Sequence, residues 1–591
     1  MSKFLILNFI DSMLSVRHQQ LDLLIVGAGG AGLTSAISAF DNADGKINIA
    51  IVSKVFANHS HTVAAQGGIN ASLGNVTADC WQWHYYDTIK GSANLADADA
   101  VEILCSKANE AILFLEHQGM VFSRDNSGKI EQRPYGGQSL NYGKGGLAYR
   151  ACYAQDKTGH SLLHTLLQQV KKRNINIFNE ILVIDLLIYQ NQCYGCLAID
   201  FNQGELIVFT SKAIILATGG YSQIYHNNTS SSICTGDGTA LVLKAGLQLQ
   251  DMEFVQFHPT GLADSGILIS EAARGEGAYL LNKHNQRFMA NYQPQTMELS
   301  CRDAISIAMA CEIKKGNGCL IDKQNTLKSD FLHLDLRHLN KQTILQKLPS
   351  LIEIASKFGN IDVFNSPIPV HPSAHYTMGG IPCNVLGEVL AGLYAVGETA
   401  CVSVHGANRL GCNSLLELVV FGQIVGKESA KIATEKIDST WHKNIANELV
   451  NNKINNLQQL FARNGNKQNL ADIKQQIKLN NEKTIGIFRD ENLLQQGIKT
   501  NTLLYSQLQS YSLSNKSLMW NNELNDYFET ENLLLNSLAV AYSALQRKES
   551  RGSHYRCDFT HAHDNFLHHS LVNINIINKE LKFNFSTKKI R

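Results

Sequence analysis

The chain has 591 residues, which is too long for a single hydrophobic core. We therefore expect roughly three or four domains of about 150 residues each. Hydrophobic residues make up 44% of it and charged residues 17%, a composition that indicates an ordinary globular protein and excludes a largely disordered one. Its formal net charge of +1 gives no electrostatic case for a nucleic acid as partner.

The thirteen cysteines are scattered without the spacing of a disulfide framework, which favours a reducing compartment. Only Cys193 and Cys196 form a C-x-x-C, inside the apolar segment CYGCLAI, and no second pair follows at zinc spacing. We expect a structural role for this pair, with a metal or redox role as the alternative. No cysteine cluster has the spacing of iron–sulfur ligands.

The N-terminal apolar run at 4–10 is too short to span a membrane and lacks the pattern of a signal or transit peptide. No other stretch reaches about 18 uninterrupted apolar residues. We therefore expect a soluble chain that reaches a membrane only through a partner.

The first predicted elements form a β-α-β unit. A buried strand, LDLLIV at 21–26, runs into GAGGAG and a helix-like stretch, LTSAISAF, and a second strand, INIAIVS, follows at 47–53. Two more apolar strands carry glycines at their ends, AIILATGG at 213–220 and GLYAVGE at 392–398. Their distance along the chain predicts one cofactor-binding domain interrupted by an insertion near 252–374.

The last third of the chain has a different pattern. All eight prolines precede residue 383, and only four glycines occur from 427 to 591. Leucines recur there at spacings of three and four residues. These features predict a helical domain at about 428–560.

A dinucleotide-binding turn is predicted where the first strand meets the first helix. Its GxGxxG glycines permit the tight turn, the approach of a pyrophosphate to the backbone, and close packing of the helix on the strand. The acidic residue expected about 20 positions later is absent, and Val52-Ser53-Lys54 stands there. This departure weakens the case for NAD and leaves FAD open. The residues assigned to this part of the cofactor-binding site are Gly27, Ala28, Gly29, Gly30, Ala31, Gly32, Ser53 and Lys54.

The segment SHTVAAQGGI at 60–69 places a histidine among small residues and a glycine pair. It resembles the flavin-attachment segment of the succinate dehydrogenase and fumarate reductase flavoprotein family. The resemblance implies that His61 carries FAD through a covalent bond to the flavin 8α-methyl group. A neutral imidazole is a competent nucleophile. The alternative is a histidine that only packs against the cofactor.

Histidines, arginines and acids recur beside glycines in QFHPTG, LISEAARGEGAYL, SCRDAISIA, HYTMGG and HGANRLGCNSLLE. Such a set fits a dicarboxylate, because arginine binds a carboxylate in a bidentate fork and histidine adds donors. The family resemblance implies that His258, Ser270, His375 and Arg409 hold the two carboxylates. It also implies that Arg302 accepts the proton and that Glu271 and Arg274 complete a relay. Guanidinium is normally always protonated, so we expect the two arginines to lie close together beside the carboxylate.

Further motifs extend the resemblance from about residue 20 to about 560, including the C-terminal signature RKESRGSHYRCDF at 547–559, to which we assign no catalytic role. The resemblance implies the remaining FAD contacts, which are Thr62, Gln66, Gly67, Gly68, Asp237, Glu398, Ser414 and Leu415. We expect an α/β Rossmann-like FAD-binding domain at 20–251 and 375–427 with an inserted α+β capping domain at 252–374. A helical domain at 428–560 and a small C-terminal segment at 561–591 would follow.

The resemblance implies oxidation of succinate to fumarate, with hydride transfer to covalent FAD. Electrons would pass to an iron–sulfur subunit, then to quinone at membrane anchor subunits, as in respiratory complex II. A flavinylation assembly factor is implied as a further partner. We expect the cytoplasmic face of a bacterial inner membrane, with the matrix side of the mitochondrial inner membrane as the alternative.

Three other functions remain open. A fumarate reductase shares the catalytic set, and Gln66 favours succinate dehydrogenase, since quinol-linked fumarate reductases more often have glutamate there. L-aspartate oxidase generally lacks the attachment histidine that is present here. An inactive assembly subunit would not need His258, Arg302, His375 and Arg409 intact.

Overall fold

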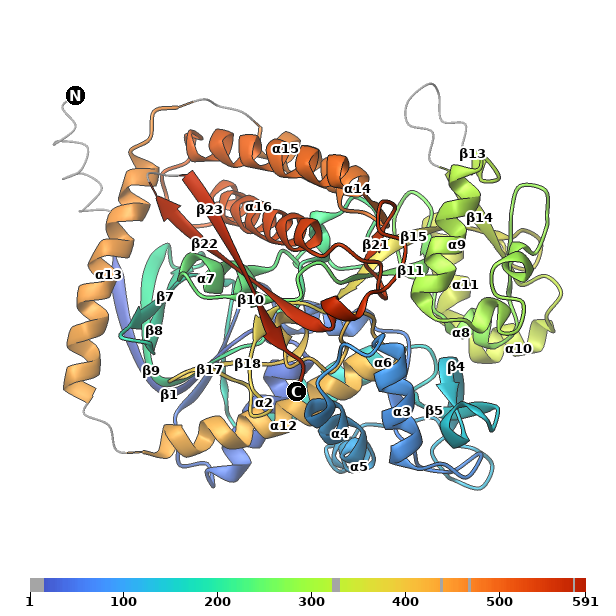
Figure 1. Cartoon of the computed structure of the whole chain (residues 1–591). Coiled ribbons are helices and arrows are strands. Elements are labelled where there is room, and N and C mark those ends of the chain that lie inside the picture. Colours follow the sequence, from blue (N-terminus) through green and yellow to red (C-terminus); the bar gives the residue numbers. More distant parts are fainter. Residues whose placement is uncertain (1–14, 321–329, 436–438, 466–468, 578–579) are drawn as a thin grey trace.

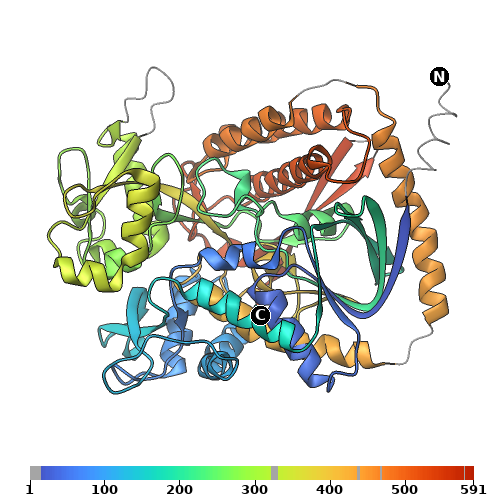
Figure 2. The ribbon, with the colours of Figure 1, turned by 180° about the vertical axis from the view of Figure 1, so that it is seen from behind.

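The computed structural model describes residues 15–320, 330–435, 439–465, 469–577 and 580–591. The apolar run predicted at 4–10 lies outside the described residues. Figures 1 and 2 show a large body with a smaller lobe at one side and helix α13 at the opposite edge. Within the described ranges, no helix is long and apolar enough to cross a membrane.

The large body is built on an eight-stranded sheet in which β1, β2, β6, β9 and β18 run parallel. Its apolar strands are buried on both faces, as a parallel sheet covered by helices requires. In order across the sheet the strands are β17 (Glu388–Leu390), β18 (Leu393–Ala395), β9 (Glu205–Leu216), β1 (Val16–Val26), β2 (Ile49–Ser53) and β6 (Asn176–Asn179), and β9 also pairs with the hairpin β7 (Ile181–Tyr189) and β8 (Gln192–Asp200).

Strand β18 returns to the sheet beside β9, so the predicted interruption of one domain is confirmed at the level of the fold. The two glycine-bearing strands end earlier than predicted, at Leu216 and Ala395, and the first of them begins earlier as well, at Glu205. Gly219 and Gly397 have φ of 76° and 70°, a left-handed conformation that extended strands do not contain. The glycine-containing C-terminal ends of the two predicted strands are therefore turns at the edge of the sheet.

Helices α2 (Gly30–Asn42) and α12 (Asn413–Thr434) pack closely against each other. A Cβ on Gly426 would lie 2.4 Å from the Ser35 carbonyl oxygen, so only glycine permits this approach. The other elements of the body are α3 (Trp81–Gly91), α4 (Ala98–Ser106), α5 (Ala108–His117), α6 (Thr158–Lys172), α7 (Asp237–Lys244), β3 (Ile69–Asn70), β4 (Gln132–Ser139), β5 (Leu147–Cys152), β16 (Ile381–Pro382) and β19 (Ala400–Cys401).

The smaller lobe has its own apolar core around an antiparallel sheet. Its strands β11 and β15 also contribute side chains to the core of the body, so they join the two parts. The predicted boundary at 374/375 falls inside β15, and the domain boundaries stay predictions. The elements are β11 (Val255–Leu262), β12 (Tyr279–Leu281), β13 (Cys319–Leu320), β14 (Asp330–Asp335), β15 (Ile368–Thr377), α8 (Ala272–Gly275), α9 (Arg302–Lys314), α10 (Lys341–Lys347) and α11 (Pro349–Gly359).

Four helices and a C-terminal hairpin complete the chain. The hairpin lies across the body in Figure 1 and pairs with β10 (Leu249–Gln250). The elements are α13 (Ser439–Phe461), α14 (Leu470–Thr484), α15 (Glu491–Gln509), α16 (Asn522–Gln546), β20 (Phe488–Arg489), β21 (Tyr555–Arg556), β22 (His568–Ile577) and β23 (Glu580–Lys589).

Candidate functional site

A cavity of about 440 Å³ runs from the first β-α turn to the boundary with the smaller lobe. Its walls include the turn after β1, the segment 60–68, the strand end at 396–398 and residues 267–271 of the lobe. One cavity thus contacts the elements predicted to hold FAD and those predicted to hold a substrate.

Two glycines of the first β-α turn have no room for a side chain. Gly27 has φ of 116°, and a Cβ there would lie 2.1 Å from the Ala217 carbonyl oxygen. A Cβ on Gly32 would lie 2.0 Å from the Gly27 carbonyl oxygen, so Gly32 serves helix packing and does not line the cavity. The bare backbone at the N-terminus of α2 fits a pyrophosphate, and FAD therefore suits the residues present.

Lys54 and Asp237 form a buried ion pair at the side of the cavity, 2.9 Å apart. Glu529, from α16, lies 3.0 Å from the same ammonium group. Burial opposes the charge on Lys54, but the two carboxylates outweigh it and raise its pKa. Asp237 also accepts hydrogen bonds from Thr235 and Asn532, at 2.6 and 3.0 Å. Its carboxylate is thus fixed and ionised beside the cavity.

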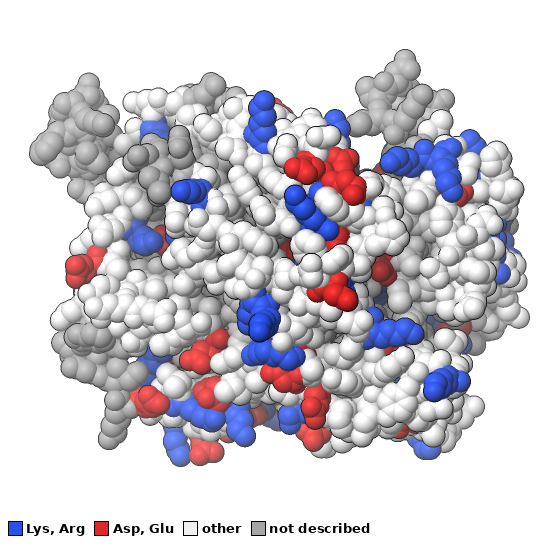
Figure 3. Space-filling view, in the orientation of Figure 1, with Lys and Arg blue, Asp and Glu red and all other residues white. Residues whose placement is uncertain are grey.

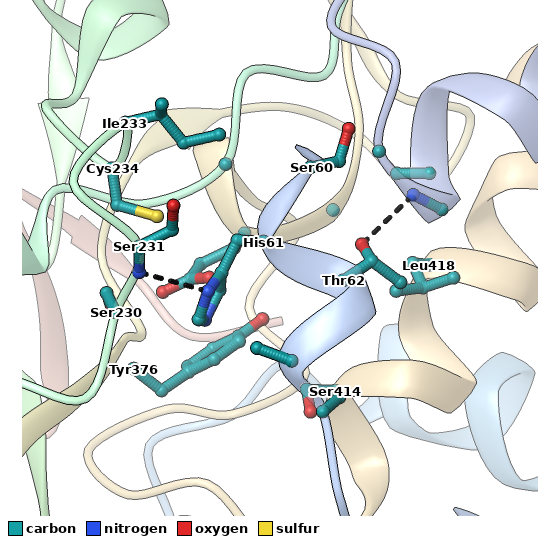
Figure 4. A pocket seen from close by; sticks show the side chains of 18 of the residues that line it. Ser60, His61, Thr62, Ser230, Ser231, Ile233, Cys234, Tyr376, Ser414 and Leu418 are labelled. Carbon is teal, nitrogen blue, oxygen red and sulfur yellow. Dashed lines mark hydrogen bonds between the residues drawn. The ribbon is translucent and has the colours of Figure 1, made fainter. Parts of the chain in front are cut away.

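His61 lies on the short 3₁₀ helix η2 (His61–Ala64), on the wall of the cavity. The Ser231 N–H donates to its Nδ1 at 3.2 Å, a contact visible in Figure 4. Burial lowers the pKa of His61 to about 4, so the ring is neutral near pH 7. Since Nδ1 accepts a hydrogen bond, the hydrogen of the neutral ring is on Nε2.

The rest of the segment at 60–69 links the first helix to the smaller lobe. Thr62 Oγ1 accepts from the Gly30 N–H at 3.1 Å, the second contact drawn in Figure 4. Gln66 Nε2 donates to the Leu268 carbonyl oxygen at 3.0 Å. One short segment therefore contacts both the start of α2 and the lobe.

His258 on β11 and His375 on β15 face each other with ring centroids 5.0 Å apart. The Thr260 N–H donates to His258 Nδ1 at 3.2 Å, and Thr229 Oγ1 lies 2.7 Å from His375 Nδ1. Burial, together with the nearby Arg302, holds the pKa of each histidine well below its ordinary value. The two rings are therefore neutral hydrogen-bonding groups.

Arg302 and Arg274 both contact Glu271. Glu271 Oε2 lies 2.8 Å from Arg302 Nε and 3.5 Å from Arg274 Nη2, and Oε1 accepts from the Gly136 N–H at 3.1 Å. Burial would raise the pKa of Glu271, but the two guanidinium groups outweigh it and lower that pKa. The proximity expected for an arginine proton acceptor is therefore present. Arg274 itself is behind Glu271, outside the cavity wall.

Gln256 connects the two cavity-lining arginines, a role that the sequence did not suggest. Its Oε1 accepts from Arg302 Nη1 and from Arg409 Nη2, each at 3.1 Å. Burial, reinforced by the charge of Arg302, lowers the pKa of Arg409 to about 10, which leaves it protonated at pH 7. Arg409 Nη1 also donates to Ser414 Oγ at 3.1 Å.

The charges at this end of the cavity do not cancel. Arg274, Arg302 and Arg409 carry three positive charges and Glu271 one negative charge, an excess of two among these four groups. Burial raises the pKa of Glu398, on the same wall, to about 7, so it is only partly ionised near pH 7. Both histidines are neutral. Two excess positive charges in a buried site match a dicarboxylate, whose two negative charges need paired donors.

The predicted site residues converge on this one cavity, with only Gly32 and Arg274 off its wall. Their individual roles stay predictions. Sequence reasoning missed several lining or supporting residues, which are Tyr135, Thr229, Ser231, Gln256, Tyr376, Cys412, Glu529 and Asn532. Three of these lie inside motifs quoted above, Gln256 in QFHPTG, Tyr376 in HYTMGG and Cys412 in HGANRLGCNSLLE, but none was assigned a role there.

Comparison with known proteins gives consistent matches along the chain. Residues 22–415 match the family described as FAD binding domain, and residues 474–591 match the family described as fumarate reductase flavoprotein C-term. The chain is 44% identical to a succinate dehydrogenase flavoprotein subunit of Rickettsia bellii, with 95% of this chain and 94% of that protein covered.

Similarity extends to fumarate reductases. The chain is 37% identical to an 8-methylmenaquinol:fumarate reductase flavoprotein subunit of Wolinella succinogenes, with 93% of this chain and 88% of that protein covered. A solved structure of E. coli quinol fumarate reductase superimposes with a TM-score of 0.90 at 36% identity, covering 97% of each chain. The similarity thus covers sequence and fold together.

Proposed function

This chain belongs to the succinate dehydrogenase and fumarate reductase flavoprotein family, and we propose that it oxidises succinate to fumarate as the flavoprotein subunit of a respiratory complex II. The observation that carries the proposal is the pair of cavity-lining arginines joined through Gln256. They lie in the same cavity as the glycine turn and His61. A dicarboxylate held there lies next to the cofactor.

Bound FAD supplies a two-electron acceptor at the cavity. The chain contributes the surfaces that hold it, which are the glycine turn at Gly27, the end of β2 at Ser53, the fixed carboxylate of Asp237 and the helix start at Leu415. Burial raises the pKa of Glu398 to about 7 even though it accepts a hydrogen bond from the Thr377 N–H. Near pH 7 the Glu398 carboxyl group is therefore partly protonated and can either donate or accept a hydrogen bond on the cavity wall.

The covalent attachment at His61 is part of the proposal. Attachment would replace the Nε2 hydrogen by a bond to the 8α-carbon, which also loses a hydrogen, and the two electrons released would reduce the flavin itself. Nδ1 would remain an acceptor only, the role that the Ser231 N–H already requires of it. The neutral state of the ring leaves a nucleophilic nitrogen available once the Nε2 hydrogen is lost.

We expect acid denaturation of the chain, produced with its assembly partners, to leave flavin on the peptide that contains His61, as measured by peptide mass. His61→Ala should release all flavin. His59→Ala, at the exposed neighbouring position, should release none. Complete release from the parent protein would contradict the attachment and would favour an L-aspartate-oxidase-like function.

For the reaction, Arg409, His258, His375 and Ser270 hold the substrate carboxylates and fix the two methylene groups. Arg302 first passes a proton to Glu271, 2.8 Å away, and the neutral guanidine then accepts the proton from one methylene. Orientation of this kind contributes up to about 7–11 kcal/mol in such reactions. The bond from Gln66 to Leu268 ties the cofactor loop to the lobe, so the position of the lobe controls access of water.

Arg302→Gln should abolish succinate-dependent dye reduction, because glutamine cannot relay a proton, while FAD content stays at the parent level. Loss of about a hundredfold or more is expected for a proton-transfer group. Arg337→Gln, an arginine near the surface of the same lobe, is the matched control and should keep parent turnover. Turnover near the parent level in the Arg302 variant would refute its role.

An iron–sulfur subunit and membrane anchor subunits take the electrons onward, and the chain associates with the membrane through them. We place it on the cytoplasmic face of a bacterial inner membrane and infer a flavinylation assembly factor as a further partner. Fumarate reduction remains the second candidate, because the Wolinella succinogenes relative bears that name. Comparing initial rates of succinate oxidation and fumarate reduction in the intact complex decides between them.

A further inference from the structure

Tyr135 places a buried hydroxyl on the wall of the cavity without a hydrogen-bond partner among the described residues. The residue is 2% exposed, lines the cavity, and its Oη contacts no donor or acceptor. A buried hydroxyl that makes no hydrogen bond lowers stability, so such groups are rare in folded proteins. A ligand in the cavity would supply the missing partner.

The ring of Tyr135 is held in one place by backbone on two sides. A Cβ on Gly411 would lie 3.4 Å from Tyr135 Cδ1 and 3.7 Å from Arg302 Nη2, so the ring and the guanidinium flank the same glycine. A Cβ on Gly67 would lie 3.4 Å from Oη. The ring therefore lies beside the glycine that Arg302 also approaches, and its hydroxyl lies against Gly67 of the segment at 60–69.

No group among the described residues accepts the Tyr135 hydrogen, and the two nearby acceptors are engaged with other donors. Glu271, the nearest carboxylate of the site, already accepts from Arg302 and from the Gly136 N–H, and Cys412 Sγ accepts from the Gly68 N–H. Burial raises the pKa of Tyr135, so the phenol keeps its hydrogen and remains a donor.

We propose that Tyr135 donates a hydrogen bond to a carboxylate oxygen of the bound dicarboxylate, as a substrate-binding residue beside Arg302. This inference rests on the proposed function and extends it. The excess of two positive charges places the anion at this end of the cavity, and a phenol is a strong donor to an ionised oxygen.

Tyr135→Phe keeps the ring and removes only the hydroxyl. We expect it to weaken binding of malonate, a dicarboxylate without the adjacent methylenes needed for oxidation, by about 10- to 100-fold, as loss of a bond to a charged group predicts. The KM for succinate should rise while kcat changes little, since the contact is made before and during the reaction. The flavin spectrum of the ligand-free complex should not shift.

Tyr511→Phe is the matched control, because its hydroxyl donates to Glu523 away from the cavity. It should lower the thermal midpoint and leave malonate binding unchanged. Tyr135→Phe should show the opposite pattern, with a ligand-free thermal midpoint at or above that of the parent.

Malonate affinity within twofold of the parent in the Tyr135→Phe complex would overturn the inference. A shift of the ligand-free flavin spectrum without a change in malonate affinity would also overturn it, because the hydroxyl would then contact the cofactor. A parent complex that neither oxidises succinate nor binds malonate would instead refute the proposed function.

Discussion

At the scale of single residues, an uncharged amide organises the cationic site. Gln256 Oε1 accepts from both Arg302 and Arg409, while Nε2 donates to Asn408 Oδ1 and to the Arg409 carbonyl oxygen, at 2.8 and 2.7 Å. A neutral acceptor holds two guanidinium groups side by side without cancelling either charge. Both charges remain available to the substrate.

Gln256→Glu tests this account, because it keeps the shape of the side chain and adds a negative charge between the arginines. We expect malonate binding to weaken about tenfold or more, since the excess charge of the site falls from two to one. Gln203→Glu adds the same charge at an exposed position and should leave binding unchanged. Titration of the flavin absorbance with malonate measures both, and equal affinities would refute the account.

The arginines and histidines of this site could be predicted from sequence, whereas Gln256 and Tyr135 could not. Dicarboxylate recognition restricts the choice to arginine and histidine, so His258 and Arg409 were recognisable in their motifs. Glutamine and tyrosine occur widely in strands, and nothing in the sequence distinguishes Gln256 or Tyr135 before the fold brings them to the cavity. Glu529 contacts Lys54 although 475 positions separate them in the chain, so no local sequence pattern predicts this pair.

At the scale of elements, the register of two strands decides where the histidines point. Gln256 pairs with Tyr376 and Phe257 pairs with Ala374, so His375 is the extra residue of a β-bulge. A bulge redirects a side chain that regular alternation would place elsewhere. The motif HYTMGG indicated a functional histidine. The sequence did not indicate that this histidine would face His258, because that contact depends on the β-bulge.

Element types were more predictable than their ends. The β-α-β opening and the helical last third follow from periodicity, and α13, α14, α15 and α16 lie where helices were predicted. The C-terminal hairpin was not predicted, because its strands β22 and β23 become stable only by pairing with each other and with β10.

At the scale of the whole molecule, buried ionic contacts fasten the C-terminal hairpin to the body. His569 on β22 lies 2.6 Å from Asp251 and 3.2 Å from Asp97, and Arg591 lies 2.9 Å from Asp97. On the face shown in Figure 3, by contrast, lysine and arginine are interspersed with aspartate and glutamate at the surface. Exposed pairs of that kind contribute little to stability, so the buried cluster carries the electrostatic part of this attachment.

This cluster predicts that the hairpin loosens in alkaline solution. Burial lowers the pKa of His569, but Asp251 and Asp97 outweigh it and raise that pKa from 6.5 to about 9. Because the folded pKa is above the unfolded one, the stabilisation is complete below pH 6.5 and is lost as the pH rises through about 9. The difference between the folded and unfolded pKa of His569 corresponds to a contribution on the order of 3 kcal/mol to the free energy of unfolding.

Hydrogen–deuterium exchange of β22, corrected for intrinsic rates, should therefore show lower protection at pH 9.5 than at pH 6.5. Strand β9 in the same protein is the internal control and should change little, because its core contains no titrating pair of this kind. His569→Gln removes the titrating ring, so its hairpin should be less protected than the parent's at pH 6.5 and no more pH-dependent than β9. Equal protection of β22 at the two pH values in the parent would mean that apolar packing alone, through Val572 and Ile574, holds the hairpin in place.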